Sequence, residues 1–169
     1  KLSPVDGLVR SAGGQMGSYN GWERVNWFSK AGDDTSEQAT QTWERAGPWA
    51  LRVKEEVEAV RDNVGVLDLA GFSRFNLSGG GAAEWLRCQI AGSLPKAGRM
   101  TLGYFPDNRG RILTEMSCIR LEEESFILIT AATAQWHDKE LIQSLVADGI
   151  YFEDITRTQD TLIITGPQS

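Results

Sequence analysis

RILTEMSCIRLEEESFILIT, residues 111–130, decides the fold class because it holds two strands joined by a short turn. Side chains in residues 111–121 alternate between two faces, as a strand requires. One face carries Ile112, Thr114, Met116 and Cys118. The charged run EEES then turns the chain, and the apolar run at residues 126–130 is typical of a buried strand. The stretch therefore predicts neighbouring strands of an antiparallel sheet.

The residues before this stretch add a helix and further strands. MTLGYF, residues 100–105, predicts a strand, and the turn formers of PDNRG follow it. Upstream, residues 79–92 form a helical pattern with Ala82, Trp85, Leu86 and Ile90 on one face. VGVLDL, residues 64–69, predicts a short buried strand, and FSRFNLSG, residues 72–79, predicts another extended piece or its continuation.

The residues after the stretch complete the pattern. Residues 135–149 predict a helix that stops at Gly149, followed by the strands YFEDIT, residues 151–156, and TLIITG, residues 161–166. The order is strand, helix, two or three strands, helix, strand. It predicts an α+β fold of the ferredoxin-like split β-α-β kind, with an antiparallel sheet and two helices on one face.

The first part of the chain differs in character. It holds four of the six tryptophans, at positions 22, 27, 43 and 49, among glycines that break any regular period. A mostly irregular arm is expected over residues 1–47, packed against another surface because so many exposed rings would not be soluble. From Pro48 valines recur at helical spacing. Residues 48–169 are therefore expected to form the compact α+β part.

Composition limits the function classes. With 169 residues, 41% hydrophobic and 24% charged, the chain is long enough for one ordinary domain. The net charge of −6 argues against sequence-independent nucleic-acid binding, and no apolar run is long enough to cross a bilayer. Cys88 and Cys118 lie outside any C-x-x-C motif, and the single histidine, His137, cannot complete a zinc site. We expect two small buried thiols in a reducing compartment.

The glycine run Gly79–Gly81 stands between a strand and a helix, where a phosphate cradle would lie. It lacks the full G-x-G-x-x-G spacing and a following lysine, so a tight turn that brings the helix onto the sheet is favoured over nucleotide binding. His137 is expected at the surface. Glu23 and Arg24 are expected to form a structural pair that pins the arm.

Glu115 is the candidate for acid–base chemistry. It is the only acid within residues 111–121, a mostly apolar strand. A partly buried carboxylate there could donate or accept a proton near neutral pH, or hold an amine or a heterocycle edge. The competing interpretation, a solvated or salt-bridged glutamate, is favoured on the residues alone. Trp22, Trp27 and Phe28 are either core aromatics or a flat-ring platform for a planar ligand.

Several motifs in order resemble one family. EVEAVRDNVGVLDL, residues 56–69, resembles the E-H-x-A-V-R-x-x-x-G-x-x-D pattern of the glycine cleavage T-protein (aminomethyltransferase) family. A helix pattern at Gly80, Ala83 and Leu86, a strand pattern at residues 108–115, and an aliphatic strand at residues 126–131 follow in family order. EDIT at residues 153–156 and Gly166-Pro167 extend the resemblance over nearly the whole chain.

The aromatic stretch GWERVNWF, residues 21–28, is similar to the start of the folate-binding region of dimethylglycine and sarcosine dehydrogenase-like flavoproteins. The resemblance implies that Trp22, Trp27 and Phe28 wall a cleft for tetrahydrofolate. It also implies transfer of a one-carbon unit from a secondary or tertiary amine. FAD would belong only to an N-terminal oxidoreductase half outside this sequence.

The chain departs from the family pattern at the site. T-proteins carry two adjacent acids on the strand, where this sequence has Thr114 and then Glu115. Thr130 stands where an Asn usually contacts the pterin, and Tyr104 lies close to, but not in register with, an expected Tyr. Glu115 is therefore the expected catalytic residue, with Tyr104, Thr114 and Thr130 in the cofactor site. The family's G-Y-T-G-E segment would lie beyond Ser169, so a fragment that is incomplete at its C-terminus, and inactive alone, is expected.

Two functions from different classes remain open. The first is a tetrahydrofolate-dependent one-carbon transferase domain, and the second is a non-catalytic folate-binding or scaffold module of the same fold. A nucleotide-binding domain built on the glycine run ranks below both. The open sheet edges of a fragment favour a dimer or aggregation. The expected location is the cytoplasm, or the mitochondrial matrix in a eukaryote.

Overall fold

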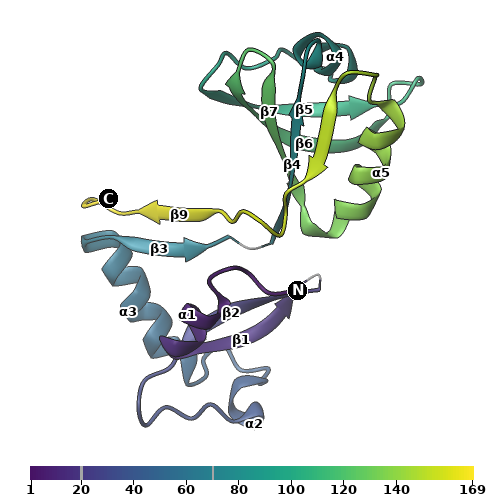
Figure 1. The fold of residues 1–169 in the computed structure, drawn as a ribbon. Helices are drawn as coiled ribbons and strands as arrows, with labels where there is room; N and C mark the ends of the chain where they lie inside the picture. Colours follow the sequence, from purple (N-terminus) through teal and green to yellow (C-terminus); the bar gives the residue numbers. More distant parts are fainter. Residues whose placement is uncertain (20, 70) are drawn as a thin grey trace. The chain divides into compact units, whose positions relative to one another are not determined.

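The computed structural model describes residues 1–19, 21–69 and 71–169, which form two compact units (Figure 1). The first unit comprises Lys1–Gly71 together with Asp160–Ser169, and the second comprises Phe72–Gln159. The second unit is thus inserted into the sequence of the first. Within the described residues no helix is both long and apolar enough to span a membrane.

The second unit is built on a five-stranded antiparallel sheet. Its strands are β4 (Phe72–Ser78), β5 (Arg99–Pro106), β6 (Ile112–Glu122), β7 (Ser125–Ala131) and β8 (Tyr151–Asp154). They lie in the order β5-β6-β7-β4-β8. The four strands β6, β7, β4 and β8 have the ferredoxin-like order that the sequence predicts, and β5 adds one strand at the edge.

Two helices cover one face of this sheet. They are α4 (Ala82–Gln89) and α5 (Gln135–Leu145), the latter entered through a short 3₁₀ helix, η1 (Ala132–Ala134). Trp85 and Leu86 of α4, Ile142 of α5 and sheet residues such as Phe75 and Leu128 form one buried cluster. The Trp85 Nε1 group donates a hydrogen bond to the Leu145 carbonyl at 2.9 Å, which ties the two helices together. Both helices therefore share the core face, as expected.

The first unit contains more regular structure than the expected irregular arm. Its elements are α1 (Asp6–Ser11), β1 (Gly14–Tyr19), β2 (Trp22–Phe28), α2 (Glu37–Thr40), α3 (Trp49–Asp62), β3 (Gly65–Asp68) and β9 (Leu162–Thr165). β1 and β2 form an antiparallel hairpin, so the prediction of a mostly irregular arm is wrong. A hairpin tolerates these glycines because its strands pair with each other.

The strand β9 corrects a second expectation. It pairs antiparallel with β3, from Gly65 opposite Thr165 to Asp68 opposite Leu162, in a separate two-stranded ladder. It is therefore not a strand of the main sheet. β3 is also not buried, because the side chains of Val66 and Leu67 are exposed. The valine-rich helix α3 follows the predicted pattern and lies in the same unit as residues 1–47. The predicted boundary at residue 47, between an arm that lines the folate cleft and a compact α+β part, stays a prediction.

Candidate functional site

The residues predicted for the site fall into both units. Trp22, Trp27 and Phe28 lie on β2 in the first unit. The other four lie on the sheet of the second unit: Tyr104 on β5, Thr114 and Glu115 on β6, and Thr130 on β7.

Glu115 lies directly opposite Tyr104 across the β5–β6 ladder. The Glu115 side chain is exposed and the Tyr104 side chain is half-buried. The neighbouring Thr114 pairs with the core residue Phe105, so it points to the helix-covered face. Thr114 and Glu115 thus face opposite sides of the sheet, as the alternation predicts. The structure brings Tyr104 and Glu115 together and separates both from Thr114.

Thr130 is buried and forms part of a polar cluster that the sequence did not reveal. Its Oγ1 donates a hydrogen bond of 2.5 Å to Oδ2 of Asp138, which is fully buried. The other oxygen, Oδ1, lies 2.8 Å from Nδ1 of His137, whose ring is mostly exposed. His137 is at the surface, as expected. Asp138 was missed because an acid in the first turn of a helix is common and usually solvated.

Trp22 and Trp27 are core residues of the first unit. Their side chains are 3% and 4% exposed, and the ammonium of Lys1 lies 5.4 Å from the ring centre of Trp22. Phe28 is half-buried, and its backbone N–H donates to Oε1 of Glu56 at 3.3 Å. Of the two interpretations left open, burial supports core aromatics for Trp22 and Trp27.

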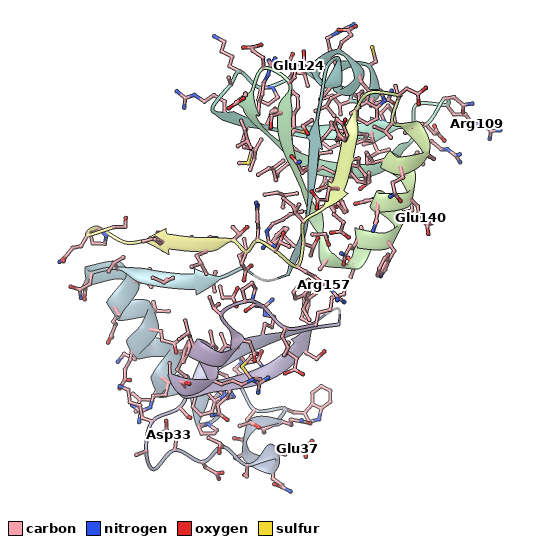
Figure 2. The ribbon with its side chains drawn as sticks, viewed as in Figure 1. Asp33, Glu37, Arg109, Glu124, Glu140 and Arg157 are labelled. Carbon is pink, nitrogen blue, oxygen red and sulfur yellow. The ribbon has the colours of Figure 1, made fainter. Side chains whose placement is uncertain are left out.

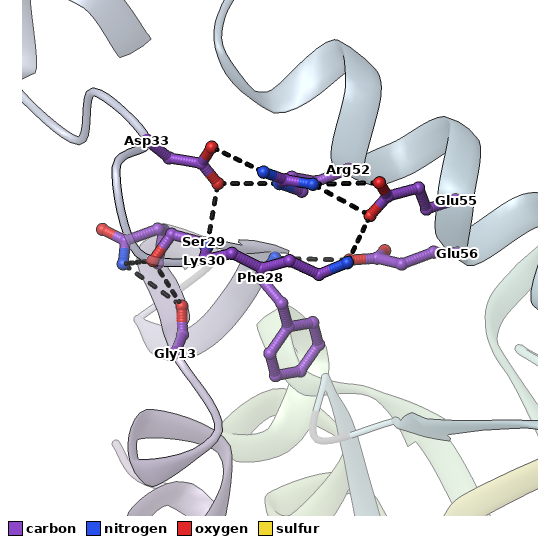
Figure 3. Close-up of polar contacts among 9 residues, drawn as sticks. Gly13, Phe28, Ser29, Lys30, Asp33, Arg52, Glu55 and Glu56 are labelled. Atoms are coloured by element: carbon purple, nitrogen blue, oxygen red, sulfur yellow. Dashed lines mark hydrogen bonds and ion pairs between the residues drawn. The ribbon is translucent and has the colours of Figure 1, made fainter.

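A network of charged side chains fixes the segment after β2 to α3 (Figure 3). Arg52 on α3 donates to both carboxylate oxygens of Asp33, and it also donates to Glu55. Lys30 donates to Glu55 Oε2 at 2.7 Å, and the backbone N–H of Lys30 donates to Asp33. These hydrogen bonds, first of all those from Arg52, lower the pKa of Asp33 to about 2. Asp33 is therefore ionised over the whole neutral range.

Glu23 and Arg24 do not pair with each other, which corrects the expectation of a structural pair. Glu23 forms an ion pair with Arg10 of α1. The guanidinium of Arg24 stacks 5.2 Å from the ring centre of Tyr19. Each residue still ties β2 to a neighbouring segment, so both have structural roles.

The first unit contains a cavity of about 830 Å³ between α1, β2, α3 and the β3–β9 ladder. Trp27 and Phe28 line it together with aliphatic side chains from all of these elements. Its charged lining residues are Arg24, Glu56, Arg61 and Asp68. Cavities of this size and apolar character are typical of small-molecule sites.

The glycine run forms the tight turn that the sequence favoured. Gly79 and Gly81 have positive φ angles of 116° and 91°, and Gly81 is the N-cap of α4. The side chain of Glu124 is labelled in Figure 2. Its Oε2 accepts a hydrogen bond of 2.9 Å from the Ala83 backbone N–H. A carboxylate at the first turn of α4 repels a phosphate, so this helix end does not favour nucleotide binding.

The fold has a counterpart among solved structures. The solved structure of glycine cleavage system aminomethyltransferase T from Bartonella henselae matches 99% of this chain and 41% of that chain, with a TM-score of 0.75 and 22% identity. That likeness concerns the fold.

The family model described as the GCVT N-terminal domain matches residues 6–169, so the chain belongs to this family. Mitochondrial dimethylglycine dehydrogenase from Rattus norvegicus is 32% identical over 151 residues, covering 89% of this chain and 17% of that protein. Aminomethyltransferase from Thermus thermophilus is 30% identical over 122 residues, covering 69% of this chain and 34% of that protein. The chain is a glycine cleavage T-type domain related to dimethylglycine dehydrogenase, and it spans a minor part of these relatives.

Proposed function

We propose that this chain forms the N-terminal part of a tetrahydrofolate-dependent domain that transfers an aminomethyl or methyl-level carbon unit. We further propose that the domain is part of an enzyme that oxidises a secondary or tertiary amine, as the name of the relative dimethylglycine dehydrogenase suggests. Family membership over residues 6–169 supports the reaction class. FAD would then serve the oxidation in a separate part of such an enzyme, and the location would be the cytoplasm or the mitochondrial matrix.

The placement of Glu115 beside Tyr104 is the observation that carries the proposal. A carboxylate and a phenol on neighbouring strands, on the face without helices, can share a proton with a bound amine. Transfer of a carbon unit to folate needs positioning and proton management in a site that excludes water. Glu115 is proposed as the proton-handling group, and Tyr104 as its neighbour in the cofactor site.

The other predicted cofactor residues take different roles in this proposal. Phe28, which is half-buried, lines the cavity of about 830 Å³ and is proposed to contact the folate. Trp22 and Trp27, which are buried, support the strand that carries it. Thr130 is engaged with Asp138 and is proposed to hold the end of β7 at the site. Thr114 points to the opposite face of the sheet from Glu115 and is proposed to support β6 rather than to contact the cofactor.

The test is a substitution series in an enzyme that includes this chain together with the remaining parts that its relatives possess. Glu115→Gln keeps the shape of the side chain and removes its proton chemistry, so production of 5,10-methylenetetrahydrofolate is expected to fall by about 10²-fold or more. Glu122→Gln, at the exposed end of the same strand, is the matched control and is expected to act like the wild type. Unchanged turnover in Glu115→Gln would remove Glu115 from the mechanism.

A non-catalytic folate-binding or scaffold module is the second candidate. The presence of Thr114 where the family pattern has its first acid favours it. Tetrahydrofolate binding measured by calorimetry, with no turnover in the same preparation, would support this candidate over the transferase.

A further inference from the structure

The ladder of β3 and β9 in the first unit is apolar and largely exposed. Leu162, Ile163 and Ile164 of β9 are 48%, 39% and 62% exposed, and Val66 and Leu67 of β3 are 66% and 48% exposed. Because side chains alternate along a strand, apolar groups are uncovered on both faces of the ladder. Two strands alone are marginally stable in water. An additional strand would therefore stabilise the ladder.

One edge of β9 is open to such a strand. Within the described residues β9 belongs to a two-stranded sheet whose other member is β3. The backbone N–H of Leu69 donates to the carbonyl of Thr161 at 2.9 Å, so the backbone groups of Thr161 face β3. Since these groups alternate between the two edges of a strand, those of Ile163 face β3 as well. The backbone groups of Leu162 and Ile164 point to the open edge.

This open edge lacks the features that keep edge strands apart. Natural proteins protect such edges with lysines, prolines or bulges. Residues 161–165, TLIIT, contain no charged residue and no proline. The register of β9 with β3 is continuous over its four residue pairs. A second copy of the same edge therefore meets no like charge there, although the whole chain has a net charge of −6.

Residues 161–165 are also nearly symmetric about Ile163. When two copies pair antiparallel about this residue, Leu162 lies opposite Ile164 of the partner subunit, and Thr161 lies opposite Thr165 of the partner subunit. Leu162 and Ile164 are the residues whose backbone groups point to the open edge, so they exchange hydrogen bonds in this register. Aliphatic pairs and threonine pairs stabilise antiparallel strands. The edge thus has the self-complementarity that a twofold axis requires.

We propose that the open edge of β9 pairs antiparallel with β9 of a second copy of this chain, with Ile163 at the twofold axis. The two ladders then form one four-stranded sheet in the order β3-β9-β9-β3. The dimer expected from open sheet edges thereby has a defined interface in the first unit. Neither Glu115 nor the sheet of the second unit takes part, so this proposal and the transferase proposal can fail independently.

The first experiment measures the mass of the 169-residue chain by light scattering over a range of concentrations. The wild type is expected to be a dimer. Ile164→Lys places a charge at the interface and is expected to raise the dissociation constant of the dimer at least tenfold. Val66→Lys is the matched control, because Val66 lies opposite Ile164 in the ladder and is similarly exposed, but belongs to β3. This variant should dimerise like the wild type.

The second experiment tests the register. An axis at Ile163 brings the two Cα atoms of this residue to about 4.5 Å from each other, as in a pair without hydrogen bonds, which is within the span of a disulfide. Ile163→Cys in a Cys88→Ser background should therefore form an intermolecular disulfide under mild oxidation. Leu67→Cys in the same background is the control, because Leu67 lies opposite Ile163 on β3 and outside the interface.

Each outcome decides the proposal. A dimer that weakens in Ile164→Lys but not in Val66→Lys, and that cross-links through position 163, supports it. A monomeric wild type, aggregates without a dimer, equal dimerisation of Ile164→Lys and the wild type, or faster cross-linking through position 67 overturns it. If circular dichroism shows that Ile164→Lys is unfolded, the cross-link at position 163 decides alone.

The same substitution in an enzyme that includes this chain together with the remaining parts of its relatives is the last check. Ile164→Lys is expected to weaken self-association there as well. If that enzyme is monomeric, or if its oligomeric state is unchanged in Ile164→Lys, a strand of the same polypeptide covers the edge. Either result would also overturn the proposal.

Discussion

Arg52 binds Asp33 through two hydrogen bonds, from Nε to Oδ2 at 2.8 Å and from Nη2 to Oδ1 at 2.9 Å. The two side chains are only 16% and 14% exposed. A guanidinium and a carboxylate in this paired geometry form one of the more specific ionic contacts in proteins. The pair ties the segment after β2 to helix α3. It therefore fixes the position of the C-terminal end of β2, the strand that carries Trp27 and Phe28.

Acid is expected to weaken the first unit through Asp33. Its folded pKa of about 2 lies below the ordinary value of 3.8, so its contribution to stability is fully present above about pH 4 and is lost as the pH falls through about 2. Urea unfolding between pH 5 and pH 2 should show a smaller loss of stability in Asp33→Asn than in the wild type. Asp62→Asn, at the exposed end of α3, serves as control. An equal pH dependence in Asp33→Asn and the wild type would contradict this role.

Removal of the Thr130 hydroxyl is expected to destabilise the second unit. Thr130→Val leaves an oxygen of the buried Asp138 without its donor, which costs about 1–3 kcal/mol in unfolding free energy. Thr130→Ser keeps the donor and should lose less. Thr165→Val, at an exposed position of β9, is the matched control. Equal stability of the Val and Ser variants by chemical denaturation would show that the hydrogen bond is unimportant.

A side chain at position 166 is expected to disturb the end of the β3–β9 ladder. Gly166 has φ of 128°, and a Cβ there would lie 2.3 Å from the carbonyl oxygen of Asn63. Gly166→Ala should therefore lose at least about 1 kcal/mol of stability. Gly7→Ala, where a Cβ meets open space, should have little effect. Matching melting temperatures for the two variants would mean that this close approach relaxes freely.

The two cysteines are expected to differ sharply in reactivity. Cys88 is exposed, so the expectation that it is buried is wrong, whereas Cys118 is fully buried, as expected, and burial raises its pKa to about 11. A thiol reagent at pH 8 should label one thiol per folded chain quickly and the second only after denaturation. Cys88→Ser should remove the fast phase. A fast phase that survives in Cys88→Ser would show that the core around Cys118 opens readily.

The sequence predicts the inserted unit better than the unit around it. The order and faces of β4 to β8 follow from local alternation and from helices that cover one side, because each strand pairs with a partner that these patterns constrain. Local patterns do not predict the pairing of β9 with β3, because this ladder joins segments about a hundred residues apart through only four residue pairs. A short apolar run predicts a strand but does not indicate which sheet that strand joins.

The β1–β2 hairpin and the polar contacts of the site are even harder to predict from the sequence. Glycines at positions 14 and 17 erase the alternation that would announce β1. Trp22 and Trp27 are core candidates by residue type, but the composition cannot show that their rings are almost fully covered. Asp138 and Arg52 depend on side chains that meet only in the folded chain. Tyr104 and Glu115 are neighbours because of strand register, which spacing alone does not fix.

Because the ladder of β3 and β9 brackets residues 72–159, the first unit is interrupted in sequence while the second is continuous. A ribosome releases all of the second unit before Leu162, and domains generally fold as units during synthesis. The sheet of the second unit can thus form completely before β9 is available to pair with β3 in the first unit. Closure of the ladder then completes the first unit, and it brings the backbone N–H of Leu69 to the carbonyl of Thr161.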